Sequence, residues 1–326
     1  MSSKNMIGDS PLFSIVIPTR NESEDVARTL EAVLAISYEP KEIIVVDDST
    51  DETPEIISRY ASRGVRLIHR AQNRNGCCGA RNLGMQMAKG EVVVIFNADN
   101  LPRSDFIHRL LSHYQNGADY VIVKSVVLNR ENPWGKYTFA AGMAWLNTNP
   151  CMEWSEGFSC RRVAAEAVGY IPGDFPVPFC RDWMIGATLN EAGFKKHVDL
   201  NIEIEHIAPA TLNSYWHNQT WRGTFSAPYS YYIGKKSLPV ILIREILKAG
   251  RTFLKYLLIL PVLLRAVRLS RYVGHWRDVP VIFFVSLIQD VAMTVGNAKG
   301  FIRLFQALLF NPSIPNQFVE PYSRSH

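Results

Sequence analysis

The stretch "EVVVIFNADNLPRSDF", residues 91–106, joins an unbroken apolar run to a polar turn. Residues 92–96 have the length and the β-branched composition of a buried strand. The run ends in "NADN" (residues 97–100), and Pro102 follows two residues later. A buried strand that ends in carboxylate and amide oxygens predicts either a divalent-metal site or a plain polar turn ahead of a helix.

Similar apolar runs lie on both sides of this stretch, namely "FSIVIP", "EIIVVDD", "VRLIH" and "YVIVKSVVL". A single helical pattern separates most of them, and the first such helix places Val26, Leu30 and Val33 on one face. Short apolar strands that alternate with helices predict an α/β fold with a parallel sheet covered on both faces. The ligand site of such a sheet lies beyond the carboxyl ends of the strands. Four polar segments fall there: residues 18–22, 47–51, 76–82 and 97–100.

The composition of the chain limits the classes of protein to which it can belong. Hydrophobic residues make up 47% of the chain and charged residues 20%, which predicts a packed core. The net charge of +5 is too small to indicate a nucleic-acid partner. Five cysteines without a C-x-x-C spacing argue against a zinc site or a disulfide framework. No continuous apolar segment occurs in "MSSKNMIGDSPLF", so we expect no signal peptide and a cytosolic setting.

Asp48, in "VVDDSTDET", is the candidate for recognising a nucleobase. An ionised carboxylate accepts from uracil N3–H or guanine N1–H but repels the acceptor nitrogens of cytosine and adenine. The bound nucleotide is therefore predicted to carry uracil or guanine. The alternative is that Asp48 and its neighbours only begin a turn or cap a helix.

Asp99 is the candidate metal ligand. One carboxylate can anchor Mg²⁺ or Mn²⁺ when diphosphate oxygens and water complete the coordination shell. Asn97 keeps a carbonyl acceptor but lacks the charge of a carboxylate, so it should weaken metal binding without abolishing it. Gly76 and Gly79 would let the backbone approach a ligand, and Arg81 would meet phosphate or ribose.

Asp182 lies at the predicted start of a helix and is either an N-cap or a general base. The positive end of the helix dipole favours the anionic form that a base needs. His206 would either complete a metal shell or pack in the core, and Trp221 and Arg222 would line a cleft or merely pack. Residues 133–182, rich in Trp, Gly and Pro, predict long loops over a cleft.

Taken in order, these motifs resemble the family 2 glycosyltransferases, which have the GT-A fold. The resemblance rests on "SIVIPTRNE", "EIIVVDDSTDET", "NGCCGARNLG", "FNADN", "EGFSCRRVAAEAVGYIP", "RDWMIGATLNEAGFK" and a late "QTWRG". It implies a GT-A type, Rossmann-like, mixed and mainly parallel sheet flanked by helices over residues 12–235. It also implies inverting, hexosyltransferase-like transfer from a nucleoside diphosphate sugar.

The resemblance and the residue chemistry together assign candidate roles. Asp182 matches the catalytic base, and Asp99 with His206 matches the metal ligands. Donor binding falls to Pro18, Thr19, Arg20, Glu22, Asp48, Gly79, Arg81, Asn97 and Asp99. The acceptor or cleft residues are Arg181, Trp183, Trp221 and Arg222. The chain departs from the family where Asn97 replaces the first Asp of Asp-x-Asp, and where Arg181 replaces the Glu before the base.

Residues 236–326 differ in composition from the rest of the chain. Ten Lys and Arg accompany a single acid, Glu245, between residues 235 and 277. Arg244, Lys248, Arg251 and Lys255 share one helical face, which predicts a basic amphipathic helix. The apolar runs 256–264 and 279–288 contain prolines and are shorter than the roughly 20 residues that cross a bilayer. We therefore expect helices lying peripherally in the cytoplasmic face of a membrane, or short hairpin spans; the alternative is a solvated charged face.

These observations predict a metal-dependent glycosyltransferase that moves a sugar from a UDP- or GDP-sugar to a hydroxyl or phosphate of a lipid-linked or cell-surface glycan acceptor. The alternative is a non-catalytic, membrane-associated protein that binds nucleotide sugars. A nucleotidyltransferase is disfavoured because "IPTRNES" is not the glycine-rich loop of that class. A dehydrogenase is disfavoured because no G-x-G-x-x-G follows the first strand.

Overall fold

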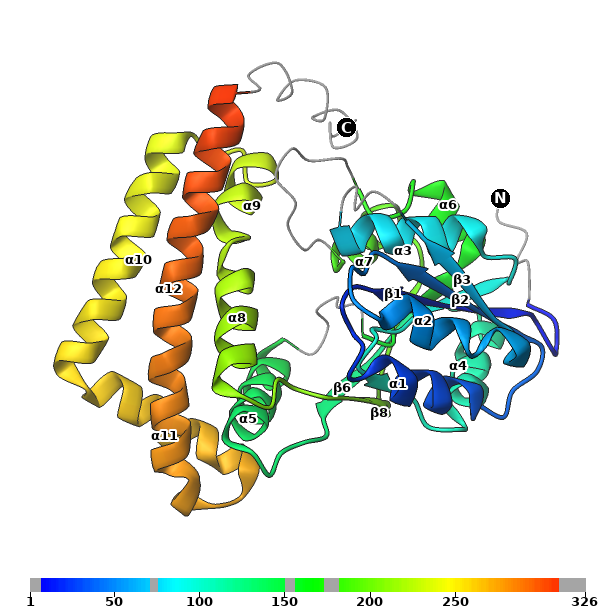
Figure 1. Cartoon of the computed structure of the whole chain (residues 1–326), viewed down its shortest axis with the longest axis horizontal. Helices are drawn as coiled ribbons and strands as arrows, with labels where there is room; N and C mark the ends of the chain where they lie inside the picture. The colour runs from blue at the N-terminus through cyan, green and yellow to red at the C-terminus, as the bar shows by residue number, and fades with distance from the viewer. Residues whose placement is uncertain (1–6, 71–75, 150–155, 173–181, 311–326) are drawn as a thin grey trace. The chain divides into compact units, whose positions relative to one another are not determined.

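The computed structural model describes residues 7–70, 76–149, 156–172 and 182–310 (Figure 1). These residues form two compact units. Of the described residues, the sheet unit takes in 7–70, 76–126, 156–172 and 182–206, and the helical unit takes in 127–149 and 207–310.

An eight-stranded mixed sheet organises the sheet unit, with the strand order β3-β2-β1-β4-β7-β6-β8-β5. The strands β1, β2, β3 and β4 are parallel, whereas β7 runs antiparallel to both β4 and β6. The strands are β1 (Phe13–Thr19), β2 (Lys41–Asp47), β3 (Val65–His69), β4 (Val92–Ile95), β5 (Asn100–Leu101), β6 (Tyr120–Val127), β7 (Ser159–Arg161) and β8 (Lys196–His206). The predicted mixed, mainly parallel α/β fold is confirmed.

Helices cover both faces of this sheet because alternate residues of a strand point to opposite faces. On one face Ile15 and Ile17 of β1 pack with α1 (Val26–Leu34), α2 (Thr53–Ser58) and α4 (Phe106–Gln115). On the other face Val16 packs with α3 (Gly76–Met87), α6 (Arg162–Ala167) and α7 (Met184–Glu191). A short 3₁₀ turn, η1 (Ala61–Arg63), precedes β3 and ends at Gly64 in the left-handed conformation.

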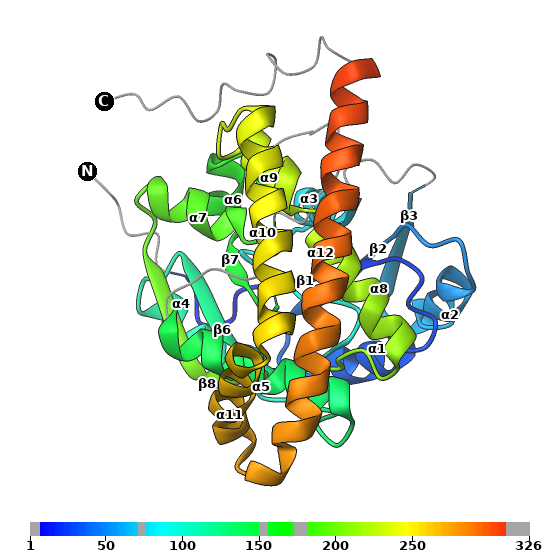
Figure 2. The ribbon, with the colours of Figure 1, turned by 90° about the vertical axis from the view of Figure 1, so that its left-hand side faces the viewer.

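The helical unit is built around one long helix. Its elements are α5 (Pro133–Thr148), α8 (Leu212–Gly223), α9 (Ser226–Tyr232), α10 (Leu238–Leu258), α11 (Leu260–Val273), η2 (Trp276–Asp278) and α12 (Val279–Phe310). The helix α12 contacts α5, α8, α9, α10 and α11. Figure 2 shows α10 and α12 running side by side. Tyr137, Tyr215 and Ile282 form part of the buried apolar cluster that joins these helices.

The compact units do not divide at residue 235, where the sequence suggested a domain boundary. The helices α5, α8 and α9 belong to the helical unit because they pack on α12. The division at residue 235 stays a prediction about domains.

Two predictions of secondary structure are wrong. Residues 133–148, expected to be loop, form α5, because Asn132 caps this helix by accepting from Gly135 N at 2.7 Å and Pro133 takes its first turn. The short apolar runs are also parts of longer helices, since Pro261 and Pro280 lie in first turns, where proline needs no N–H partner. Trp276–Phe310 is long and apolar enough to cross a membrane.

Glycines bring the backbones of α8 and α12 unusually close. A Cβ added at Gly296 would lie 2.1 Å from Thr220 O, and one at Gly300 would lie 2.3 Å from Thr224 O. Both obstacles are backbone atoms, so neither can be relieved by a side-chain rotation. The two helices therefore depend on glycine at these positions.

Replacing Gly296 by Ala is expected to lower the free energy of unfolding by about 1–3 kcal/mol, because the added methyl group forces two packed helices apart. Thermal unfolding measures the change. Gly250→Ala in α10 is the matched control, because nothing lies within 4 Å of its added Cβ. The control should stabilise by about 1 kcal/mol through helix propensity. A Gly296→Ala protein as stable as the control would contradict the close approach of α8 and α12.

Candidate functional site

The polar segments that follow β1 and β2 are joined by hydrogen bonds at the carboxyl edge of the sheet. Thr19 Oγ1 donates to Asp47 Oδ1 at 2.7 Å, and both side chains are buried. Asn21 N donates to Ser49 Oγ at 2.8 Å. Neighbouring parallel strands end at the same edge, which is why residues 18–22 meet residues 47–51.

Arg70 links the second of these segments to the third. Its Nε donates to Asp48 Oδ1 at 2.6 Å, and its Nη2 donates to Asp48 Oδ2 and, at 3.0 Å, to Gly76 O. Asp48 is buried, so this two-pronged contact fixes the orientation of its carboxylate. Carboxylate oxygens have further lone pairs and can still accept from a nucleobase. The sequence reasoning missed Arg70, whose only signal is a cation directly after the run "VRLIH".

Arg81 joins the remaining segments. Its Nη2 donates to Asn97 Oδ1 at 2.7 Å and lies 3.8 Å from Asp182 Oδ2. The Arg81 side chain is only 5% exposed, whereas the Asp182 side chain is 20% exposed and open to an incoming group. The N-cap of α7 is Trp183, not Asp182, and it makes no side-chain cap hydrogen bond. Asp182 Oδ1 accepts from Trp183 N at 3.1 Å, at the start of α7, so both interpretations of Asp182, a cap and a base, stay predictions.

Asp99 lies among other acids at the end of β4. Burial raises its pKa to about 7, with a further rise from Glu156 and Glu22 and an opposing effect of His206. Burial, followed by the charges of Asp25 and Asp51, likewise raises the pKa of Glu22 to about 7. Crowded, desolvated carboxylates disfavour one another's charge, so this edge of the sheet favours a bound cation.

His206 is held in place from one side of its ring. It pairs across the sheet with Asn100, the residue after Asp99. Its Nδ1 lies 3.0 Å from Ser125 Oγ and 3.7 Å from Glu156 Oε2, and Ser125 Oγ donates to the same Glu156 carboxylate. Sequence reasoning did not single out Glu156 or Ser125. Glu156 stands two residues before the buried "FSC" run, and only the fold brings it to β8.

Among the described residues, no group of three or more His, Cys, Asp and Glu side chains has the geometry of a metal site. Mg²⁺ in phosphate-transfer sites, however, is often held by one or two protein ligands together with phosphate oxygens. The donor set of Asp99 and His206, with the carboxyl groups of Glu22 and Glu156 nearby, fits such a two-ligand site.

The other predicted site residues differ in burial and in the elements that carry them. Pro18 and Thr19 are buried in β1, and Arg20 is exposed just beyond it. Gly79 lies inside α3 rather than in a loop, because the helix already begins at Gly76. Trp183 is half-buried.

Two cleft candidates belong to the helical unit. Trp221 and Arg222 are exposed near the end of α8, and the Trp221 ring packs edge-on to Phe225 at 4.4 Å. Arg181 lies outside the described residues. The structure therefore brings Asp48, Arg81, Asn97, Asp99, Asp182 and His206 to one edge of the sheet unit and leaves the remaining cleft assignments as predictions.

A mixed sheet with this strand order and polar groups at the carboxyl ends of β1, β2 and β4 defines a GT-A type α/β domain. Residues 14–169 match the family model described as glycosyl transferase family 2. The chain therefore carries a domain of glycosyl transferase family 2.

Two curated relatives share part of this domain. The glycosyltransferase GlyG of Streptococcus pneumoniae is 35% identical over 117 residues, which cover 35% of this chain and 38% of the relative. The beta-monoglucosyldiacylglycerol synthase of Nostoc sp. is 30% identical over 143 residues, which cover 41% of this chain and 30% of the relative. The matched region thus spans less than two fifths of either relative.

A solved structure extends the likeness in fold. The mannosyltransferase PcManGT from Pyrobaculum calidifontis, in complex with GDP-Man and Mn²⁺, aligns with a TM-score of 0.58 at 17% identity. The alignment covers 89% of this chain and 87% of that one. At this identity the likeness concerns the fold.

Proposed function

We propose that this protein is an inverting glycosyltransferase that moves a sugar from a UDP- or GDP-sugar to a hydroxyl or phosphate of a lipid-linked or cell-surface glycan acceptor. The observation that carries the proposal is the position of Arg81, which contacts Asn97 of the donor segment and faces Asp182 at 3.8 Å. A phosphate-binding cation and a partly exposed carboxylate thus lie side by side, as transfer from a nucleoside diphosphate sugar requires.

Asp48 supports the choice of nucleotide. Arg70 orients this carboxylate by donating to both of its oxygens, and the remaining lone pairs accept the N–H of uracil or guanine. Cytosine and adenine present an acceptor at this position and are repelled. The fold neighbour PcManGT binds GDP-Man, which is consistent with a guanine or uracil donor.

Asp99 and His206 would hold Mg²⁺ or Mn²⁺ together with the diphosphate of the donor. When bound, the ion supplies positive charge that stabilises the departing diphosphate. Ser125 and Glu156 occupy the Nδ1 side of the His206 ring, which leaves Nε2 as the ligand nitrogen. Arg81 adds a second positive charge toward the diphosphate.

Asp182 accepts the proton of the acceptor group. Its side chain is the more exposed partner of the pair with Arg81, so an acceptor reaches it from solvent. Attack on the anomeric carbon from the side opposite the diphosphate inverts the configuration. The contribution of a well-placed general base is about 10²–10⁴-fold in rate.

Attachment to a membrane would explain the composition of the helical unit. One helix, Trp276–Phe310, is long and apolar enough to cross a bilayer, and α10 exposes Ile243, Leu247, Leu254 and Leu258. A relative is named as a synthase of a glycolipid, which supports a lipid-linked acceptor. We place the protein at the cytoplasmic face of a membrane, where nucleotide sugars are available.

Thermal shift against a panel of nucleotide sugars, with and without Mn²⁺, tests this function. One nucleotide class should stabilise the protein by about 2.7 kcal/mol at a ligand concentration of 100 times Kd, and only with the metal. Release of UDP or GDP from the stabilising donor is then measured with lipid extract as acceptor. Stabilisation without release would favour the non-catalytic alternative, and the absence of stabilisation by every donor would reject nucleotide-sugar binding.

A further inference from the structure

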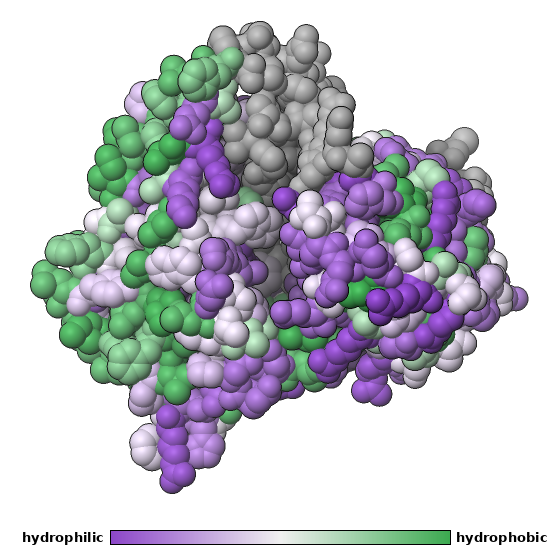
Figure 3. All heavy atoms as spheres, in the orientation of Figure 1, coloured by the Kyte–Doolittle hydropathy of each residue, from purple (hydrophilic) through white to green (hydrophobic). Residues whose placement is uncertain are grey.

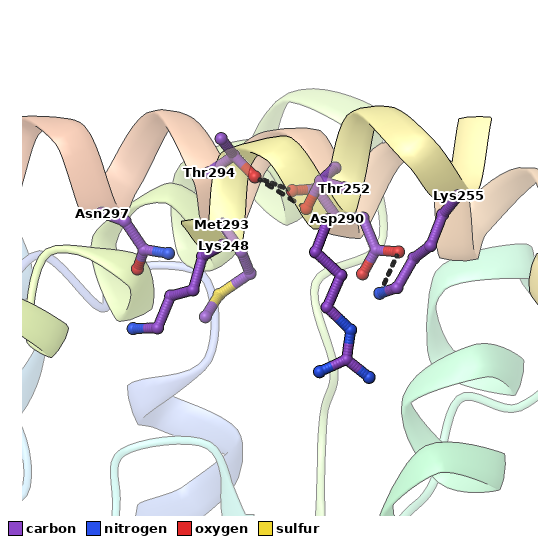
Figure 4. Close-up of a pocket in the computed structure, with 8 residues that line it drawn as sticks. Lys248, Thr252, Lys255, Asp290, Met293, Thr294 and Asn297 are labelled. Atoms are coloured by element: carbon purple, nitrogen blue, oxygen red, sulfur yellow. Dashed lines mark hydrogen bonds and ion pairs between the residues drawn. The ribbon is translucent and has the colours of Figure 1, made fainter. Parts of the chain in front are cut away.

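A polar pocket lies between α10 and α12 of the helical unit. Its volume is about 290 Å³, and both of its walls are helices (Figure 4). The helix α10 contributes Lys248, Arg251, Thr252 and Lys255, and α12 contributes Asp290, Met293, Thr294 and Asn297. A pocket of this size accommodates the headgroup of a lipid rather than a whole lipid.

The pocket carries a surplus of positive charge. Asp290 is shared between Lys255 at 3.2 Å and Arg265 at 3.0 Å. Glu245, next to the pocket, is likewise shared between Arg244 at 2.9 Å and Lys248 at 3.0 Å. Arg251 is exposed, and no ion pair joins it to another described residue. Among the residues that line the pocket, three cations therefore face the single carboxylate of Asp290, a surplus that calls for an anion of more than one negative charge.

The uncharged lining adds hydrogen-bonding groups. Asn297 Oδ1 is buried and has no hydrogen-bond partner among the described residues. The side chain of Asn297 also lines the pocket, and the N–H groups of its amide can donate to an anion there. The hydroxyl of Thr252 lies 3.4 Å from that of Thr294 at the rim (Figure 4). Neutral donors of this kind can bind phosphate oxygens alongside the cations.

The surroundings of the pocket are apolar. Exposed Ile243, Ile246, Leu247, Leu254 and Leu257 lie on the side of α10 opposite its buried residues Ile241 and Glu245. Figure 3 shows a hydrophobic patch on this side of the helical unit. Lys248, Arg251 and Lys255 follow one another at helical spacing along the flank between the two faces. Charged residues avoid the bilayer centre, so these cations mark the depth of the lipid headgroups. The helix α12, whose residues Asp290 and Asn297 line the pocket, then lies along the membrane surface and does not cross it.

We propose that this pocket binds the phosphate group of an anionic membrane lipid. The guanidinium of Arg251 grips two phosphate oxygens, Lys248 adds a point charge, and the acyl chains lie along the apolar face of α10. The inference goes beyond the proposed function, because it requires neither a donor nor sugar transfer. In this proposal the helical unit recognises lipid headgroups and does not attach to the membrane through apolar contacts alone.

Vesicle flotation with the full chain tests the proposal. Vesicles contain phosphatidylcholine alone, phosphatidylcholine with phosphatidic acid, or phosphatidylcholine with oleate at the same surface charge. Binding should be tightest to the vesicles with phosphatidic acid, and Arg251→Gln should weaken that binding about ten-fold or more, since a two-pronged phosphate contact is lost. The matched control is Arg268→Gln, which removes an equal charge from an exposed site of α11. It should weaken binding less than about three-fold, through general attraction alone.

Asn297→Asp is the second variant, because it removes no cation and keeps the size of the side chain. A carboxylate at this position should repel phosphate and lower binding to phosphatidic acid about as much as Arg251→Gln does. Equal losses for Arg251→Gln and Arg268→Gln, or equal binding to phosphatidic acid and oleate, would overturn the proposal in favour of diffuse attraction. The proposal would also be overturned if inorganic phosphate raised the Tm of the protein while the vesicles showed no preference for phosphatidic acid. The pocket would then bind a soluble anion.

Discussion

Asp182→Asn is expected to lower the rate of sugar transfer by about 10²–10⁴-fold while nucleotide affinity changes little. The amide has the size of the carboxylate but does not accept a proton from the acceptor. Asp182 contacts Arg81 at 3.8 Å, and Arg81 keeps its hydrogen bond to Asn97 at 2.7 Å in the variant, so the donor segment stays in place. Single-turnover release of UDP or GDP measures the rate, and calorimetric titration measures the affinity.

The matched control for this prediction is Asp105→Asn. Asp105 is a half-exposed acid whose ion-pair partner, Arg103, lies 3.6 Å away on the same surface turn. This variant should transfer sugar at the normal rate, because a surface pair of this kind contributes little. Normal transfer by Asp182→Asn as well would remove Asp182 from the role of base. Loss of nucleotide affinity together with rate would instead make Asp182 a donor-binding residue.

The strands and most helices of the sheet unit could be predicted because local patterns determine them. Runs such as residues 92–95 are too apolar for anything but a buried strand, and Gly64 ends its turn with φ of 89°, where glycine is favoured. The edge at which the polar segments meet also follows from parallel pairing alone. The helix α5 was missed because a Trp- and Gly-rich composition outweighed the readable signal of Asn132 followed by Pro133.

The partners of the site residues could not be predicted, because they come from distant parts of the chain. Arg70 reaches Asp48 across 22 positions, and Glu156 meets Ser125 across 31. The local periodicity of the sequence does not encode such pairs of distant side chains, because they form only when the strand order brings the two positions together. Helix lengths in the helical unit were missed for another reason, since proline was taken to interrupt helices that it in fact begins.

Asp99→Ala is expected to abolish the stabilisation that Mn²⁺ and nucleotide give together, and to lower transfer at least about 10²-fold, the scale of losing one electrostatic contact to the transition state. Without metal, the same change should raise Tm at pH 8. Burial and neighbouring acids raise the pKa of Asp99 from 3.8 to about 7, so the folded state binds this proton more tightly than the unfolded state. Stability is therefore lost as pH rises from about 4 to about 7, and removing the group removes the loss.

Asn97→Asp is the complementary change, and it distinguishes an effect on metal binding from an effect on the stability of the fold. In the geometry of Asn97, the new carboxylate lies 2.7 Å from Arg81 Nη2 and forms an ion pair with that guanidinium. This ion pair offsets the repulsion between the new carboxylate and Asp99, so the metal-free Tm should change little. Bound Mn²⁺ gains a second negative charge nearby, so the increase of Tm on adding metal should exceed that of the unaltered protein. If Asn97→Asp lost transfer while Asp99→Ala kept it, the metal would belong to residue 97 and not to Asp99.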